Sequence, residues 1–254
     1  MPNWVKNVVT TSEETMTKIK EKYFENGILD FNKIIPMPKT LNLTSGSITE
    51  RAVFYALCQK DRNTQKEICE LLKSKEEYMY GNYLNQINHY YESGHFKNIE
   101  KLAKEFVPDS EARELGITSL EQLGDTYIEN IRKYGCTTWY DWCIENWGTK
   151  WGVSRFSCNE TTMIFETAWA TPENIFEKLA LEFSTDTIEV RYADEDYSSD
   201  NNGILTYING VCEYDTGLDE DFIAEVWYEQ IEQDNISKDI TKNSFLKFLK
   251  TFES

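Results

Sequence analysis

The chain has 254 residues, enough to bury its own hydrophobic core, and an aromatic content of 14% excludes a disordered chain. Its 44 acidic and 26 basic residues give a net charge of −18, which opposes direct binding to nucleic-acid phosphates or to acidic lipid surfaces. The favoured partners are therefore basic: a cation, a basic substrate, or a protein surface that itself holds nucleic acid.

The first part of the chain alternates between strand and helix patterns. Residues 4–10 are rich in β-branched side chains and predict a strand. Ser12, followed by two acidic residues, predicts the start of a helix that ends near Gly27. Residues 29–35 predict a second strand, because their pattern is apolar and the prolines that follow cannot donate to a sheet.

The next part has helical periodicity alone. From residue 47 to about 106 the apolar residues recur at helical spacing, and Pro108 closes the block. Ser119 then resembles a helix cap and opens a further helix through Ile131. We therefore interpret residues 47–133 as a helical insertion.

A tryptophan-rich segment follows from residue 137. Trp139, Trp142 and Cys143 share one helical face, and Gly148 is a natural helix end. A platform on which nucleobases stack normally lies in a groove lined by lysine and arginine, and few basic residues are near this segment. Core packing is therefore our interpretation of these tryptophans, with a protein-binding hot spot as the second.

The remaining sequence alternates again between strand and helix. The turn signal Asn209-Gly210 predicts a hairpin between two strands. The predicted elements are a strand at 161–169, a helix that starts at Pro172, a strand at 187–192, the hairpin strands 203–208 and 211–214, and helices at 221–232 and 243–250.

Several of these segments carry a family likeness. The run from Trp147 to Trp151, the Ile-Pro-Met-Pro stretch ending at Pro38, and residues 165–172 resemble the YubB ferredoxin-like family of phage and plasmid proteins. The resemblance implies a ferredoxin-like core and a mobile-element setting, and it supplies no catalytic residues.

From pattern and resemblance together we expect an α+β fold. An antiparallel ferredoxin-like sheet, with helices on one face, is expected from residues 1–46 and 134–234. The helical insertion is expected at 47–133 and a C-terminal helix at 235–254. No stretch approaches the roughly 20 apolar residues that span a bilayer, and the N-terminus lacks the apolar part of a secretory signal. The six scattered cysteines are interpreted as reduced thiols of a cytoplasmic protein.

The placement of charge is the main functional signal. Residues 186–234 hold fifteen acidic residues and a single base, Arg191, a net charge of −14 out of −18. Such crowding is costly unless a basic partner offsets it, so we expect these carboxylates on one outer face. The predicted partner-binding residues are Asp194, Glu195, Asp196, Asp200, Asp215, Asp219, Glu220 and Asp221.

The sequence also offers sites of other kinds. Asp194, Glu195, Asp196 and Asp200 are a possible calcium loop, but the glycine and closing glutamate of an EF-hand are missing at the required spacing. The cysteines and the two histidines lack the paired spacing of a zinc site. No phosphate-binding loop or nucleophile motif is present. We therefore expect no metal, no cofactor and no catalytic residue set.

The expected function is that of a binding protein of a mobile element. It would inhibit a host nucleic-acid-handling defence complex, such as a CRISPR effector or a restriction enzyme, by placing its carboxylates in a basic groove of that complex. Direct nucleic-acid binding and membrane binding are not expected. Two alternatives stay open: a metal-dependent hydrolase or nuclease, and an accessory regulatory protein that docks through its tryptophans.

Overall fold

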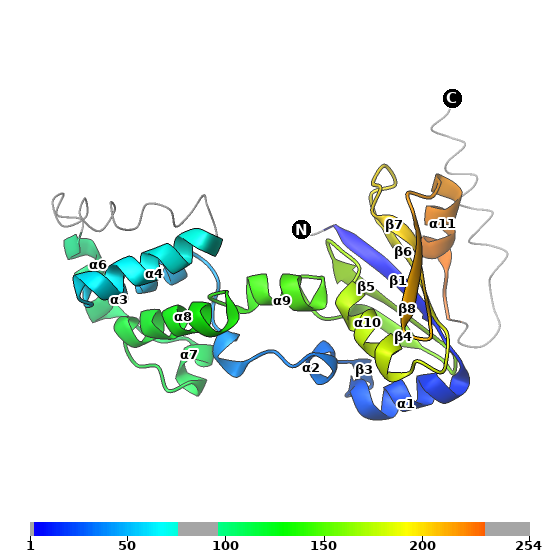
Figure 1. Ribbon diagram of the computed structural model, residues 1–254, viewed down its shortest axis with the longest axis horizontal. Coiled ribbons are helices and arrows are strands. Elements are labelled where there is room, and N and C mark those ends of the chain that lie inside the picture. The colour runs from blue at the N-terminus through cyan, green and yellow to red at the C-terminus, as the bar shows by residue number, and fades with distance from the viewer. Residues whose placement is uncertain (1–2, 76–95, 232–254) are drawn as a thin grey trace. The chain divides into compact units, whose positions relative to one another are not determined.

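The computed structural model describes residues 3–75 and 96–231 (Figure 1). The chain divides into two compact units, Met1–Ile35 with Trp147–Ser254, and Pro36–Asn146. The helical unit therefore begins before residue 47 and extends beyond residue 133, because the segments that flank the predicted insertion pack with its helices. The helix expected at 243–250, the C-terminal helix at 235–254 and the two histidines, His89 and His95, lie outside the described residues.

The first unit is built on a six-stranded antiparallel sheet. Its order is β4-β5-β1-β6-β7-β8, with β1 at the centre. The strands are β1 Trp4–Thr10, β4 Ser154–Cys158, β5 Thr162–Ala168, β6 Ile188–Asp194, β7 Asn202–Ile208 and β8 Val211–Thr216. With helices α1 and α10 the chain order is β1-α1-β4-β5-α10-β6, the connectivity of a ferredoxin-like fold, which the β7–β8 hairpin extends.

One face of the sheet carries the main core of this unit. Helices α1 (Glu13–Tyr23) and α10 (Glu173–Glu182) bury their apolar sides against it. The ring of Phe165 on β5 lies 6.2 Å from the ring of Phe176 on α10. The predicted cap is confirmed, because the Ser12 side chain accepts a hydrogen bond from the Thr15 amide at the start of α1.

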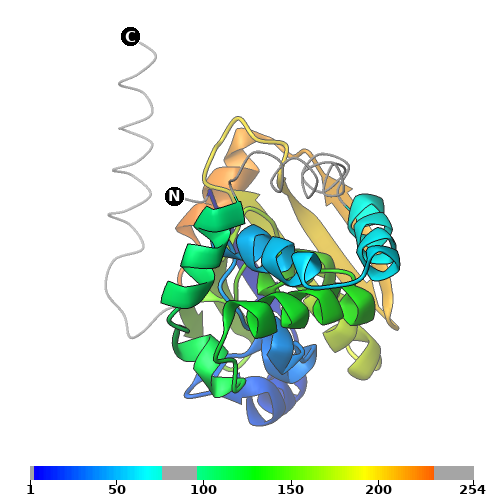
Figure 2. The ribbon, with the colours of Figure 1, turned by 90° about the vertical axis from the view of Figure 1, so that its left-hand side faces the viewer.

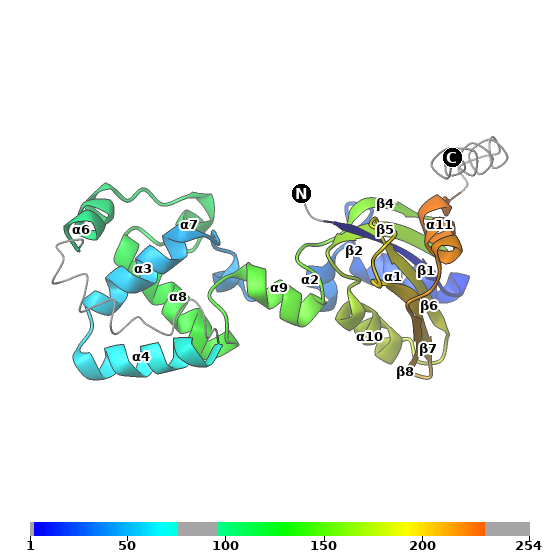
Figure 3. The same ribbon diagram turned by 90° about the horizontal axis from the view of Figure 1, so that it is seen from above.

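The opposite face carries a helix as well. Helix α11 (Glu220–Tyr228) lies against β6 and β1, on the side of the sheet away from α10 (Figure 3). Its buried Ile223 and Val226 pack on Val8, Ile164 and Ala193, which project from this face. The predicted antiparallel α+β sheet is confirmed, and α11 adds a second covered face to it.

The expected strand at 29–35 was wrong. Only Ile28–Leu29 pairs as a strand, β3, with β2 (Phe24–Glu25), and the chain then turns into the short helix α2 (Phe31–Ile34). The Asp30 side chain accepts a hydrogen bond from the Asn32 amide at 2.9 Å and so caps α2. This local side-chain bond gives the backbone an alternative to the sheet.

The helical unit holds most of the segment expected to be helical. Its described elements are the 3-10 turn Lys39–Leu41, α3 Ser47–Cys58, α4 Arg62–Lys75, α6 Phe96–Glu105, α7 Ser110–Glu114, α8 Leu120–Tyr134 and α9 Trp139–Trp147, which runs to the unit boundary. Helices α3 and α8 lie against each other (Figure 2). The cap of α8 at Ser119 is confirmed, since its side chain accepts from the Gln122 amide.

None of the six cysteines, all of which lie in the described residues, forms a disulfide, and Cys69, Cys136 and Cys143 are buried in the helical unit. Burial raises the pKa of Cys143 to about 12, and the Cys136 thiol adds to the rise. Burial also raises the pKa of Cys69 to about 11. The unfolded thiols ionise near pH 9, whereas the folded ones keep their protons. The stability that this difference gives is therefore complete below pH 9 and is lost as the pH rises toward 12.

This titration predicts alkaline destabilisation of the helical unit. Each thiol removes about 1.4 kcal/mol of unfolding free energy per pH unit above its unfolded pKa. Between pH 9 and 10.5, we expect the free energy of unfolding of Cys143→Ala to fall by about 2 kcal/mol less than that of the wild type. Urea unfolding followed by circular dichroism at several pH values measures this slope. If the free energy of unfolding of Cys143→Ala fell with pH as steeply as that of the wild type, Cys143 would ionise as readily in the folded protein as in the unfolded chain.

Candidate functional site: the acidic end of the sheet

The predicted acidic residues come together through the strand order. Strand β6 ends where β7 begins, and β8 ends beside the start of β7. The connection between β6 and β7 and the first turn of α11 lie at this same end (Figure 1). We define the acidic end as the exposed residues Glu195, Asp196, Asp200, Asp215, Asp219, Glu220 and Asp221.

Asp194 departs from the prediction. Its side chain is only 5% exposed, so it is not part of the outer surface. Its Oδ1 accepts a hydrogen bond from the Asp196 amide at 2.9 Å, and its Oδ2 accepts one from Asn201 Nδ2 at 3.1 Å. Asp194 therefore shapes the loop after β6, and the expectation that it lies on the outer face with the other acids is corrected.

Local structure accounts for several of the exposed acids. Asp219 caps α11, because its Oδ1 accepts a hydrogen bond from the Phe222 amide at 3.1 Å. Glu220 and Asp221 follow in the first turn, where the helix dipole favours negative charge. Asp196 accepts two hydrogen bonds from Ser198, and these hold the pKa of its carboxyl below the ordinary value.

The acidic end keeps its charge unneutralised. Arg191, the one base in this part of the sequence, lies 3.3 Å from Glu229 and 3.9 Å from Glu189. Across residues 3–75 and 96–231, no lysine or arginine forms an ion pair with any of the seven acids. Their mutual repulsion is therefore not offset by ion pairs within the described residues.

Helix α11 is fixed at both ends. At its start, the Leu218 amide donates to Asn202 Oδ1 at 2.7 Å. At its end, Lys6 Nζ donates to the carbonyl oxygens of Trp227 and Glu229 at 2.8 and 2.7 Å, where the helix dipole favours a cation. Trp227 Nε1 also donates to the Asp194 carbonyl at 2.8 Å. These bonds hold the acids of α11 beside those of the β6–β7 loop.

Lys6 makes this anchor from a buried position. Its burial lowers its pKa, while the Glu166 and Glu229 carboxylates partly oppose that effect. Glu166 is itself 6% exposed, and Arg155 Nη1 lies 3.1 Å from each of its oxygens, with hydrogen-bond geometry to Oε1 alone. The cluster therefore ties β4, β5, β1 and α11 together.

Three tryptophans border the acidic end, and they were not predicted as a group. The rings of Trp4 and Trp151 lie 6.3 Å apart, and the Trp4 amide donates to Glu195 Oε1 at 3.1 Å. Trp169 follows β5 and is 51% exposed. Its φ of 72° is unusual for a bulky residue. No sequence signal marked Trp169, because an aromatic residue after a strand normally faces the core.

Two tryptophans of the tryptophan-rich segment behave as expected. Trp142 and Trp147 are each 6% exposed, which confirms core packing for these two. Trp147 Nε1 donates to the Ile35 carbonyl at 2.9 Å. Trp151 differs, because it is 37% exposed and the Lys150 ammonium lies 4.5 Å from the centre of its ring.

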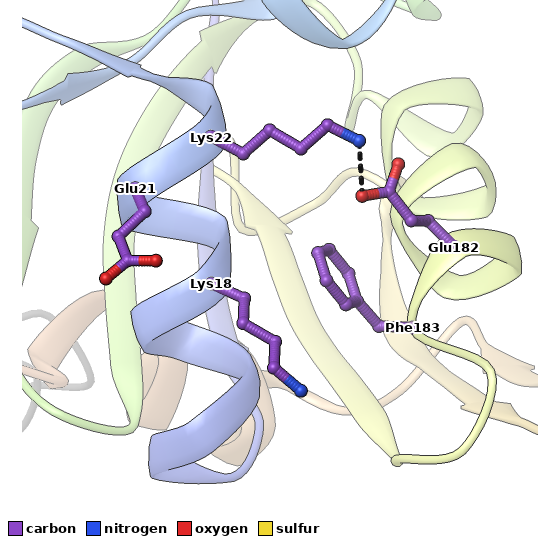
Figure 4. Close-up of a pocket in the computed structure, with 5 residues that line it drawn as sticks. All are labelled: Lys18, Glu21, Lys22, Glu182 and Phe183. Carbon is purple, nitrogen blue, oxygen red and sulfur yellow. Dashed lines mark hydrogen bonds and ion pairs between the residues drawn. The ribbon is translucent and has the colours of Figure 1, made fainter.

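A shallow hollow of about 490 Å³ lies between α1 and α10, on the other face of the sheet (Figure 4). Lys22 and Glu182 form an ion pair of 2.6 Å across it. Phe183 and two further charged side chains of α1 complete its lining. Three of its charged groups are taken up by ion pairs, Lys22 with Glu182 across the hollow and Lys18 with Glu14 beside it.

In the described part of the chain, no three His, Cys, Asp or Glu side chains are close enough together to hold a metal ion. No described helix is long and apolar enough to cross a membrane.

The fold and this site define an α+β protein with a ferredoxin-like sheet and an exposed acidic end. Residues 146–241 match the family model described as "Ferredoxin-like domain in Api92-like protein". No curated protein matches the chain. A crystal structure of the protein api92 from Yersinia pseudotuberculosis is similar at 12% identity and a TM-score of 0.40, covering 85% of this chain and 98% of that one. The family-model match and the strand order of the sheet confirm the ferredoxin-like class, and the narrower resemblance to the YubB family stays a prediction.

Proposed function

We propose that this protein is an interaction protein of a phage or plasmid that inhibits a host nucleic-acid-handling defence complex. The acidic end would occupy a basic groove of that complex and exclude nucleic acid from it. The observation that carries the proposal is the grouping of seven exposed carboxylates, without an ion pair among the described residues, at one end of the sheet.

Electrostatics supports a basic partner. Carboxylates held on a folded surface lose little conformational freedom on binding, and they steer a cationic surface toward them from a distance. The exposed Trp169 and the Trp4–Trp151 pair add flat aromatic area beside these charges. Arginine side chains suit such a border, because guanidinium groups stack on aromatic rings and pair with carboxylates.

The mobile-element setting rests on the sequence. The run from Trp147 to Trp151 resembles the YubB family of phage and plasmid proteins. Such a protein gains from blocking a defence complex whose nucleic-acid groove is necessarily basic. A cytoplasmic location in the host cell belongs to the same proposal.

Charge neutralisation tests the proposal. The variants Glu195→Gln/Asp196→Asn/Asp200→Asn and Asp219→Asn/Glu220→Gln/Asp221→Asn each remove three negative charges and keep shape, and asparagine still caps α11. The host complex captured from lysate at low salt is purified, and its affinity for each variant and for DNA is measured. We expect about tenfold weaker binding for each triple variant, corresponding to about 1.4 kcal/mol.

The matched control is Glu50→Gln/Glu114→Gln/Glu121→Gln, which removes three exposed charges from the helical unit. We expect it to bind within twofold of the wild type. If all three variants bind equally well, or if the complex holds DNA and this protein together, the proposed inhibition by an acidic surface is wrong.

The alternatives have separate readouts. A metal-dependent hydrolase would bind Mg²⁺, Mn²⁺ or Ca²⁺ tightly in calorimetry. An accessory protein that docks through its tryptophans would keep its partner at high salt, whereas the acidic end loses it as ions screen the charges.

A further inference from the structure

Within the part of the chain that the structure describes, strand β8 forms an open edge of the sheet. It is the outermost strand, it pairs with β7 alone among the described segments, and most of its residues are exposed. The other edge strand, β4, differs because its register shifts between Ser154 and Ser157, its Arg155 has a φ of 46°, and β3 lies beside it. A bulged and covered edge does not accept another strand, whereas an extended open edge does.

The register shows which backbone groups of β8 point outward. Asn209 and Gly210, with φ of 53° and 76°, form the two-residue turn that joins β7 to β8. In such a hairpin the two residues that flank the turn, Ile208 and Val211, form backbone hydrogen bonds with each other. Along β8, residues bonded to β7 then alternate with residues whose N–H and C=O point away from β7, starting with the residue after Val211. The outward residues of β8 are therefore Cys212, Tyr214 and Thr216.

The side chains of β8 alternate in character. Glu213 and Asp215 are exposed on the face that carries α11. Tyr214 lies between them, projects to the other face and is 77% exposed. Val211, at the start of the strand, is 66% exposed. An incoming strand would thus meet negative charge on one face and a large aromatic ring on the other.

A second copy of this chain is a poor occupant. If β8 paired antiparallel with its own copy around Tyr214, Glu213 would face Asp215 of the copy. A shift by one pairing step places Glu213 opposite Glu213, or Asp215 opposite Asp215. Like charges directly opposite each other destabilise a strand pair, so every long overlap is penalised.

We propose that β8 accepts an extended, basic segment of a partner protein as a seventh, antiparallel strand. Its side chains would alternate between Lys or Arg, facing Glu213 and Asp215, and apolar residues, packing on Tyr214. Main-chain hydrogen bonds supply affinity in this mode, and the alternating side chains supply specificity. The inference rests on the proposed function, in that both require a basic partner protein, and it names how that partner is held.

The test uses capped heptapeptides and the whole protein. The probe alternates lysine and valine, KVKVKVK, and in an antiparallel pair its valines are the residues whose N–H groups face β8. N-methylation of the valines removes these donors and keeps the charge, whereas N-methylation of the lysines leaves the pairing edge intact. We expect the unmodified and lysine-methylated peptides to bind equally, and the valine-methylated peptide and EVEVEVE to bind at least tenfold more weakly.

Protein variants separate backbone pairing from charge. Tyr214→Pro removes an outward N–H without breaking the ladder to β7, and proline is tolerated on an edge strand. We expect it to lose at least tenfold in affinity for KVKVKVK, whereas Tyr214→Thr, which keeps the N–H, stays within about threefold. Glu213→Lys/Asp215→Lys is expected to reverse the preference in favour of EVEVEVE. Unchanged circular dichroism confirms folding of each variant.

Hydrogen exchange gives a residue-level readout. With peptide at ten times its Kd, exchange of the Cys212, Tyr214 and Thr216 amides should slow about tenfold. The proposal is overturned if the exchange rates of these amides do not change, or if no basic peptide binds. It is also overturned if the valine-methylated peptide binds as well as the unmodified one, or if the protein dimerises in a way that Tyr214→Pro prevents. Peptide pairing without capture of any defence complex would leave this inference standing and remove the proposed function.

Discussion

Gly124→Ala should strongly destabilise the helical unit. A Cβ at this position would lie 2.0 Å from the Ala52 carbonyl oxygen and 2.7 Å from the Ala56 Cβ. Both neighbours belong to α3, and the first is backbone, so α3 and α8 would have to move apart. We expect a loss of about 3 kcal/mol, which outweighs the gain of about 1 kcal/mol from the helix preference of alanine over glycine.

Hydrogen exchange measures this effect where it arises. The opening free energy of amides in α3 and α8 should fall by about 2–3 kcal/mol, while amides of β1 and β6 in the other unit should change little. Gly152→Ala is the matched control, because its Cβ would have no atom within 4 Å. It should change stability by less than about 0.5 kcal/mol. If Gly124→Ala were as stable as the wild type, α3 and α8 would not be this close in solution.

Gly124 also shows what the sequence leaves hidden. A glycine in a helical pattern signals a close approach, but its neighbour in space lies about 70 residues earlier in the chain, and no local pattern names it. The helices themselves were predictable, because caps such as Ser12 and Ser119 and apolar spacing are local signals. The error at 29–35 arose where an equally local signal, the Asp30 cap of α2, competed with an apolar run.

The candidate site was predictable in part for the same reason. Charge crowding in residues 186–234 is visible in the sequence, and the hairpin signal at Asn209-Gly210 fixes β7 against β8. The burial of Asp194 was not visible, since it depends on Asn201 and on the turn after β6. Trp169 was missed because its exposure depends on contacts with residues from both halves of the sheet unit.

The segment that presents Trp169 is held by a buried polar network centred on Asn7. The Trp169 amide donates to the Asn3 carbonyl at 2.9 Å, and Asn201 Nδ2 donates to the Trp169 carbonyl at 3.0 Å. Beneath it, Asn7 Nδ2 donates to Thr167 Oγ1 at 2.9 Å, and Thr171 Oγ1 donates to Asn7 Oδ1 at 2.5 Å. Residues held in the left-handed region persist when surrounding contacts over-determine them.

Asn7→Val should therefore destabilise the sheet unit and release Trp169. The substitution suits a strand, but it removes the buried acceptor of the Thr171 hydroxyl and the amide that donates to Thr167 Oγ1, at a cost of about 3 kcal/mol. Thr171→Val should cost about 2 kcal/mol, because Asn7 Oδ1 is then orphaned. The double variant should cost about 1 kcal/mol less than the sum, since each single change leaves a polar group that the second change removes.

Denaturant unfolding of the wild type, the two single variants and the double variant gives the coupling free energy between Asn7 and Thr171. The fluorescence of Trp169, isolated by comparison with Trp169→Phe, reports whether this side chain is released. Thr206→Val is the matched control, because this half-buried strand residue makes no side-chain hydrogen bond within the described residues, and it should change stability by less than about 0.5 kcal/mol. Strict additivity of the Asn7 and Thr171 effects would show that the two side chains are not bonded. In that case the contacts of Asn3 and Asn201 alone would hold Trp169 beside the acidic end.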